Sequence, residues 1–186
     1  YFASEGAAVF LIESLESARR RDAAILGELS STAMTSDHRT DDHSSDGAAI
    51  RQAMQTALVG DNDRAIQPHV IIPSANGSLG VDASEATAIA SMLAGQPEPA
   101  VIWPLKTLTG EALGAGAGFG VAAALAMLRG RQLPAVMSAS DLDCDLPMQD
   151  ASLGPAGNGA ASVLVNSVDP GGSIVSLVLQ SFSSDT

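Results

Sequence analysis

The stretch LKTLTGEALGAGAGFGVAAALAMLRG, residues 105–130, constrains the fold of this chain more than any other segment. No charged side chain lies between Glu111 and Arg129, and glycine recurs at every second position from 114 to 120. Three kinds of structure contain such a segment: a membrane span, a phosphate-binding loop, and a helix buried inside a protein. The surrounding sequence favours one of them.

The membrane and phosphate-loop interpretations both fail on length or spacing. The apolar segment from Ala112 to Leu128 is a little short for a bilayer, and no second span accompanies it. The third glycine of a dinucleotide-binding motif would fall on Phe119 or Val121, and no Gly-Lys-Ser/Thr sequence follows to form a P-loop. A helix that is apolar all round is buried on every side. It fits best between two sheets, of which this chain supplies one.

The flanking segments alternate between strand and helix patterns. Strands are predicted over residues 6–14, 23–34, 69–74, 100–105, 159–168 and 173–182, and helices over residues 47–59 and 81–95, with a short helix or turn over 16–22. Asp46 is expected to cap the first long helix, Gly95 to end the second, and Asp-Pro-Gly-Gly to form a tight turn between the last two strands. This alternation predicts an α/β fold with a parallel, right-handed sheet and helices on both faces.

Composition and charge exclude several classes of function. The 186 residues are 46% hydrophobic and 16% charged, which fits one globular domain or a large piece of one. A net charge of −12 argues against nucleic-acid binding. Cys144 is the single cysteine and lies between aspartates, so we expect an inert thiol and a reducing cytoplasm. His38 and His43 lie in an acidic loop whose spacing matches no metal-ligand template, and neither a metal nor a cofactor is expected.

Five segments, in order, resemble the C-terminal half of a thiolase-fold β-ketoacyl synthase, the condensing enzyme of fatty-acid and polyketide assembly. They are SEGAAVFLIESLESARRRDAAI, SANGSLGVDASEATAI, PLKTLTGEALGAGAGFGVAAALAMLRG, LPAVMSASDLDCDLP and NSVDPGGSIVSLVL. The resemblance covers essentially residues 1–186 and implies a layered α-β-α-β-α fold with a buried Gly/Ala-rich helix. It also implies that the N-terminal half, which carries the family's nucleophilic cysteine, is not in this chain. We therefore expect a fragment, a cleavage product or a split subunit.

The resemblance places the family's two catalytic histidines at Asn76 and Glu111. Asparagine can donate a hydrogen bond to an oxyanion but cannot shuttle a proton near neutral pH, and an ionised glutamate would repel an enolate. Lys106 is retained, with Glu85 or Glu111 as its candidate partner. Both substituted positions also have structural interpretations, because Asn-Gly favours a tight turn and a glutamate suits the positive end of a helix dipole.

The hairpin that forms the family's flexible aromatic gate has also changed. Its residues here are Val168, Asp169, Pro170, Gly171 and Gly172, in which the family's Phe-Gly-Phe is replaced and the two glycines are kept. An aromatic gate is therefore not expected in this chain.

The loss of both histidines on an otherwise intact scaffold resembles the chain-length factor of type II polyketide systems. The resemblance implies a non-catalytic subunit that pairs with an active ketosynthase and shapes the tunnel holding the acyl chain. The implied partners are the N-terminal half of the fold, a catalytic ketosynthase and an acyl carrier protein. Two alternatives stay open: part of an active but atypical acyltransferase or malonyl decarboxylase whose cysteine lies on the missing half, and a structural or binding module.

Overall fold

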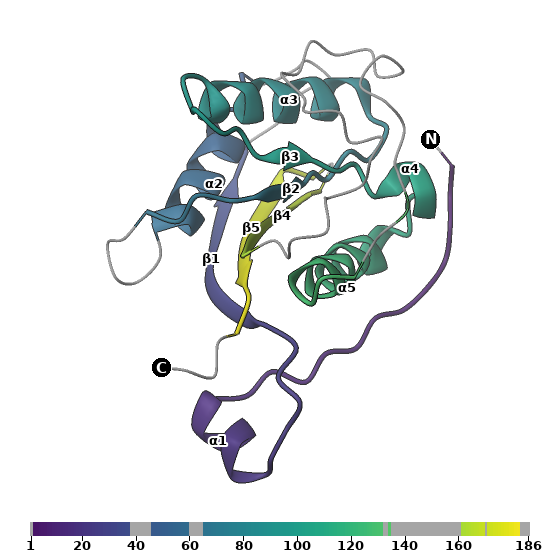
Figure 1. Cartoon of the computed structure of the whole chain (residues 1–186). Coiled ribbons are helices and arrows are strands. Elements are labelled where there is room, and N and C mark those ends of the chain that lie inside the picture. Colours follow the sequence, from purple (N-terminus) through teal and green to yellow (C-terminus); the bar gives the residue numbers. More distant parts are fainter. Residues whose placement is uncertain are drawn as a thin grey trace.

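The computed structural model describes residues 2–37, 46–59, 65–131, 134, 161–169 and 171–182. Its elements, in chain order, are α1 (Leu15–Arg20), β1 (Glu28–Ser36), α2 (Ala48–Val59), β2 (Val70–Ile72), α3 (Leu79–Leu93), β3 (Val101–Ile102), α4 (Lys106–Thr109), the 3₁₀ turn η1 (Leu113–Ala115), α5 (Gly116–Leu128), β4 (Ser162–Val168) and β5 (Ser173–Gln180) (Figure 1). None of the described helices has the length and apolar character that crossing a bilayer requires.

The five strands form one sheet in the order β1-β5-β4-β2-β3. Strand β2 runs parallel to β3 and β4, whereas β5 runs antiparallel to both β4 and β1. The predicted parallel sheet is therefore mixed, with β5 alone running against the other strands. The reason is the short connection between β4 and β5, because a tight turn can join only antiparallel neighbours. The Asp169 carbonyl accepts a 2.8 Å hydrogen bond from the Gly172 N–H, which confirms the expected turn.

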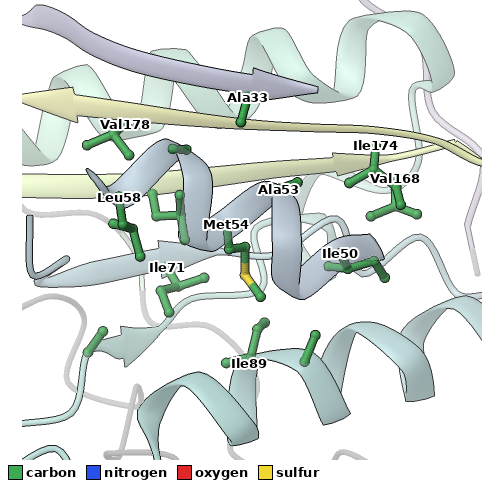
Figure 2. Close-up of a cluster of buried hydrophobic side chains, with 14 of the residues drawn as sticks. Ala33, Ile50, Ala53, Met54, Leu58, Ile71, Ile89, Val168, Ile174 and Val178 are labelled. Atoms are coloured by element: carbon green, nitrogen blue, oxygen red, sulfur yellow. The ribbon is translucent and has the colours of Figure 1, made fainter. Parts of the chain in front are cut away.

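Side chains alternate between the two faces of the sheet and fill two separate cores. Ile71 and Leu164 face α2 and α3, where they pack with Ile50, Met54 and Ile89 (Figure 2). The residues on either side of each, Val70 and Ile72 on β2 and Val163 and Val165 on β4, face α5 together with Trp103. Helices thus cover both faces of the sheet, as the sequence predicted, with α2 and α3 on one face and α5 on the other (Figure 1).

Local signals set the ends of the long helices. Asp46 accepts a 3.0 Å hydrogen bond from the Ala48 N–H at the start of α2, which confirms the expected cap. Gly95 follows the end of α3 with φ +77°, a conformation that glycine adopts without a steric penalty.

Strand β1 begins five residues later and ends two residues later than the pattern indicated. It was predicted over residues 23–34 and runs from Glu28 to Ser36. Its ladder with β5 extends from Glu28 opposite Gln180 to Ser36 opposite Ser173, and β5 ends at Gln180. Residues before Glu28 have no ladder partner on β5. The bounds of β1 are therefore set by its neighbour and not by its own apolar pattern.

The predicted strand over residues 6–14 is wrong for the described part of the chain. This segment is extended but belongs to no ladder, and Val9, Leu11 and Ile12 are 94%, 75% and 75% exposed. The apolar pattern predicted a buried strand, but a strand needs a neighbouring edge with which to pair its backbone. Among the described residues, only Ala3, further toward the N-terminus, forms an isolated bridge, with Glu111.

Helix α5 packs against the sheet through residues with small or flexible side chains. Gly120 lies so close to β4 that an added Cβ would be 2.8 Å from Val165 Cγ1. On the outer side, the extended N-terminal segment passes over the helix, and an added Cβ at Gly118 would lie 2.7 Å from the Cβ of Ala8 (Figure 1). Ala122 remains exposed. Enclosure of α5 by a second sheet stays a prediction, since the described residues form one sheet.

We predict that Gly120→Val destabilises the protein, because the branched side chain must displace Val165 or push α5 away from the sheet. The expected loss is about 1–3 kcal/mol of unfolding free energy, measured by urea denaturation. Gly114→Ala is the matched control, since a Cβ there meets no atom within 4 Å. Equal stability of the two variants would contradict the close approach of α5 to the sheet.

Candidate functional site

The candidate site lies where the parallel strands end. Strands β2, β3 and β4 point in one direction, so their carboxyl ends meet at one edge of the sheet. Asn76 follows β2, Lys106 follows β3, and Val168 ends β4. In open α/β sheets this edge is the usual place for a ligand. A small recess opens here, lined in part by Pro73, Lys106, Gly116, Asn166 and Ser167.

Lys106 and Glu111 form a largely buried ion pair beside this recess. The Lys106 Nζ donates a 2.6 Å hydrogen bond to Glu111 Oε2, and the two side chains are 16% and 8% exposed. Glu111 Oε1 accepts a 2.7 Å hydrogen bond from the Leu113 N–H at the start of η1. The glutamate thus neutralises the lysine and also caps the beginning of the glycine-rich helical segment, as expected for a carboxylate at the positive end of a helix.

The backbone of Glu111 is tied to the N-terminal segment. Its N–H donates to the Phe2 carbonyl at 2.7 Å, and its carbonyl accepts from the Ser4 N–H at 2.9 Å. Gly110, the preceding residue, has φ +71°, and an added Cβ would lie 2.8 Å from the Phe2 carbonyl oxygen. A glycine is therefore required for the N-terminal segment to cross the chain at this point.

Glu85 has partners other than Lys106, which corrects that candidate pairing. Its side chain is buried inside the loop that follows β2. Oε1 accepts hydrogen bonds from the Ser74 N–H at 2.8 Å and from the Asn166 amide at 3.1 Å, while Oε2 accepts from the Ala75 N–H at 3.0 Å. Burial raises the pKa of Glu85, and these three donors oppose the rise by stabilising the ionised carboxylate.

A polar network, found by the structure and not expected from the sequence, extends from Glu85 into the sheet. The Asn166 side-chain oxygen accepts a 2.8 Å hydrogen bond from the Ser176 hydroxyl on β5. The Ser74 hydroxyl accepts from the Val168 N–H at 3.1 Å. All of these groups are buried, where an unpaired polar atom would cost free energy. The sequence Asn-Ser in the final hairpin, already noted in the resemblance, was the available signal for Asn166.

Asn76 lies in a tight turn at the mouth of the site. Its side-chain oxygen accepts a 2.9 Å hydrogen bond from the Ser78 N–H, and its amide nitrogen lies 3.5 Å from the Val168 carbonyl. The amide is therefore only weakly held on its donor side. The preceding residue, Ala75, has φ +38°, an uncommon conformation for a residue with a Cβ, and Glu85 holds its N–H in place.

Asp82 lies on the first turn of α3, beside the turn that contains Asn76, and it was not a predicted site residue. Its Oδ2 accepts a 3.0 Å hydrogen bond from the Gly77 N–H, and Oδ1 is buried without a hydrogen bond. Burial raises the pKa of Asp82 above its usual value of 3.8. The backbone N–H groups of Gly77 and Asn76 and the charge of Lys106 oppose this rise, whereas the charge of Glu111 adds to it. The charges of Lys106 and Glu111 thus act on Asp82, which is bonded to the turn that contains Asn76.

Some predicted features lie partly or wholly outside the described residues. Val168 ends β4, and the Gly171 N–H donates a 2.7 Å hydrogen bond to Asp169 Oδ1 within the final turn, while Pro170 is not described. Cys144, His38 and His43 also lie outside the described residues. Across the parts of the chain that the structure describes, no group of three or more His, Cys, Asp or Glu side chains could hold a metal ion.

Residues 26–140 match the profile of the family described as Beta-ketoacyl synthase, C-terminal domain. The chain belongs to this family. The matched range includes Asn76 and Glu111, the two positions at which the resemblance places the family's catalytic histidines, and it also includes Lys106. Among curated proteins, the tetracenomycin polyketide synthase ketoacyl synthase beta subunit of Streptomyces glaucescens is 34% identical over 137 residues, which make up 72% of this chain and 32% of that protein. The chain therefore spans about a third of the length of that β-ketoacyl synthase relative.

Solved structures share the fold. One, a type II polyketide synthase acyl-carrier protein in complex with its ketosynthase, matches with 24% identity and a TM-score of 0.76 over 91% of this chain and 42% of that one. The ishigamide ketosynthase/chain length factor matches with 23% identity and a TM-score of 0.77 over 97% of this chain and 44% of that one. At these identities the likeness establishes the fold alone. The fold is thiolase-like, of the ketosynthase C-terminal type, as the sequence predicted.

We predict that Glu85→Gln loosens the loop carrying Asn76, because an amide group replaces one acceptor oxygen and would face backbone donors. The expected cost is about 1–3 kcal/mol, with faster amide hydrogen exchange at Ser74 and Ala75. Glu98→Gln, at an exposed position, is the matched control. Unchanged exchange at these two amides would show that the buried carboxylate does not hold the loop.

The raised pKa of Asp82 predicts a dependence of stability on pH. The folded state binds this proton more tightly than the unfolded state, so the unfolding free energy falls as the pH rises from 3.8 through the raised pKa. Asp82→Asn removes this dependence, and its stability relative to the parent should therefore increase between about pH 4 and pH 7. Urea denaturation across this range measures the difference; a constant or decreasing difference would contradict the assignment.

Proposed function

We propose that this chain is part of a non-catalytic, chain-length-factor-like subunit of a type II polyketide β-ketoacyl synthase. The subunit pairs with an active ketosynthase and shapes the tunnel that holds the growing acyl chain. The observation that carries the proposal is the state of Glu111. At a position assigned by resemblance to a proton-handling histidine, its carboxylate is bound to Lys106 and to the Leu113 N–H.

The second substituted position supports the same function. Asn76 has its side-chain oxygen engaged with the Ser78 N–H, and an amide does not gain or lose a proton near neutral pH. Meanwhile the groups that support the site, Lys106, Glu85 and Asn166, are present and paired. A site with its scaffold intact and with both histidine positions substituted suits a subunit that shapes a tunnel and leaves the chemistry to a partner.

The proposed partners follow from the relatives. The similarity to a ketoacyl synthase beta subunit supports pairing with a catalytic ketosynthase. The fold shared with a ketosynthase that binds its acyl-carrier protein supports an acyl carrier protein as the carrier of the acyl chain. We further propose that an N-terminal half of the fold supplies the second sheet over α5 and pairs with the extended residues 6–14. The assembly is proposed to act in the cytoplasm.

We predict that the product chain length follows the identity of this subunit. The full-length protein is co-expressed with its ketosynthase and acyl carrier protein, and then exchanged for the beta subunit of the tetracenomycin system with the same ketosynthase. Mass spectrometry of the polyketides should show a change in the number of extender units, because the walls of the tunnel limit the length. A change in yield without a change in length would contradict the proposal, as would a stable, monodisperse protein purified without a ketosynthase.

An active but atypical synthase or decarboxylase is the second candidate. The weakly held Asn76 amide favours it, because that amide could donate a hydrogen bond to an oxyanion. In this case a cysteine-directed acyl inhibitor should label the full-length polypeptide that contains this chain. Labelling of the partner ketosynthase alone would argue against this candidate.

A further inference from the structure

The Glu111 carboxylate occupies a small anion-binding arrangement built by its neighbours. One oxygen is bound by the Lys106 ammonium at 2.6 Å, and the other by the Leu113 N–H at 2.7 Å. The lysine side chain is 16% exposed and the glutamate side chain 8%. At this degree of burial a charge-assisted hydrogen bond is stronger than in water. The donors would attract any carboxylate that could reach them.

The backbone at this point has the form of an anion-binding turn. Ala112 has φ −101° and ψ 16°, and Leu113 has φ +50°. Successive residues in right-handed and left-handed conformations direct their N–H groups to one side, which creates a concave site for a negative charge. A left-handed conformation costs roughly 1 kcal/mol or more for a residue with a Cβ. The Glu111 carboxylate offsets that cost.

A small recess borders this arrangement on the side of Lys106. It is lined by Lys106 itself, and by Gly116, Asn166 and Ser167 from α5 and β4. Gly116 keeps the space open, since an added Cβ would lie 3.2 Å from Glu111 Oε1 and 3.3 Å from Lys106 Cε. The lysine that lines the recess therefore has its charge already balanced from within the chain.

We propose that Glu111 is an internal competitor for anionic acyl groups. Its carboxylate fills the site that Lys106 and the Leu113 N–H would otherwise offer to the carboxylate of an acyl unit. The consequence, which rests on the proposed function, is that this subunit excludes acyl units bearing a free carboxylate and accommodates neutral acyl chain. Glu111 then determines which acyl groups this subunit accepts, beyond its role as a cap on η1.

Chemical rescue separates this proposal from a purely structural role for Glu111. The full-length protein, in complex with its ketosynthase, carries Glu111→Ala, which removes the carboxylate and leaves space. Propionate is then titrated at constant ionic strength while the thermal unfolding midpoint is measured. We expect a saturable rise of about 3 °C at tenfold excess over the dissociation constant, because a ligand that binds only the folded state stabilises it.

Two controls identify the site. Propionamide, the neutral analogue of propionate, should produce no rise, and neither should propionate added to the unaltered protein. In the double variant Lys106→Met, Glu111→Ala, the rise should disappear, because the cation that binds the carboxylate is gone. An equal rise in all of these samples, or none in Glu111→Ala, would overturn the proposal.

A second variant covers the case in which Glu111→Ala does not fold. Glu111→Gln keeps the shape of the side chain and removes the negative charge that balances the Lys106 ammonium. The acetylation rate of Lys106 by acetic anhydride, measured by mass spectrometry, should rise at least threefold, and propionate should lower it again. No protection by propionate would overturn the proposal. Neither measurement involves polyketide length. The proposed function can therefore fail while the anion site is retained, and the anion site can fail while the proposed function is retained.

Discussion

The bare glycine face of α5 determines both how the core packs and how the candidate site is built. At Gly120 the missing side chain lets β4 approach, so that Val165 fills the space against the helix backbone. One turn earlier, at Gly116, the same face leaves room for the Lys106 and Glu111 side chains. A helix with larger residues at these positions would lie further from the sheet. The ion pair would then be more exposed to water, which would weaken the attraction between its charges.

Two carboxylates hold this edge of the sheet in place, and each does so through backbone N–H groups. Glu85 binds the loop after β2, and Glu111 binds the start of η1. Buried polar groups of this kind contribute modestly when paired and cost much more when one partner is lost. The shape of the site therefore depends on charge pairing as well as on apolar packing.

The extended N-terminal segment carries apolar side chains that lie exposed in the described part of the chain. Residues 9, 11 and 12 are apolar and exposed, and α5 is covered by this segment on only part of its outer side. The matched solved ketosynthases are more than twice as long as the part that this chain covers. Burial of this segment by a second sheet is part of the proposed function, and it would remove these apolar side chains from water.

Local pattern determined much of this protein. The apolar periodicity of residues 47–59 and 81–95 correctly predicted α2 and α3, Asp46 and Gly95 marked their ends, and the absence of charge in residues 112–128 predicted a packed helix. The residues also resembled a β-ketoacyl synthase, and the family match confirms this. These features depend on neighbours within a few positions along the chain, so the sequence carries them directly.

Tertiary structure alone decided the rest. The direction of β5 and the bounds of β1 follow from which strands lie side by side, and the pairing of Glu85 with Asn166 follows from which segments meet at the carboxyl ends of β2 and β4. Ser74 and Ser176 joined the site for the same reason. Pairings between residues tens of positions apart depend on the three-dimensional arrangement of strands, and no local pattern of side chains specifies it.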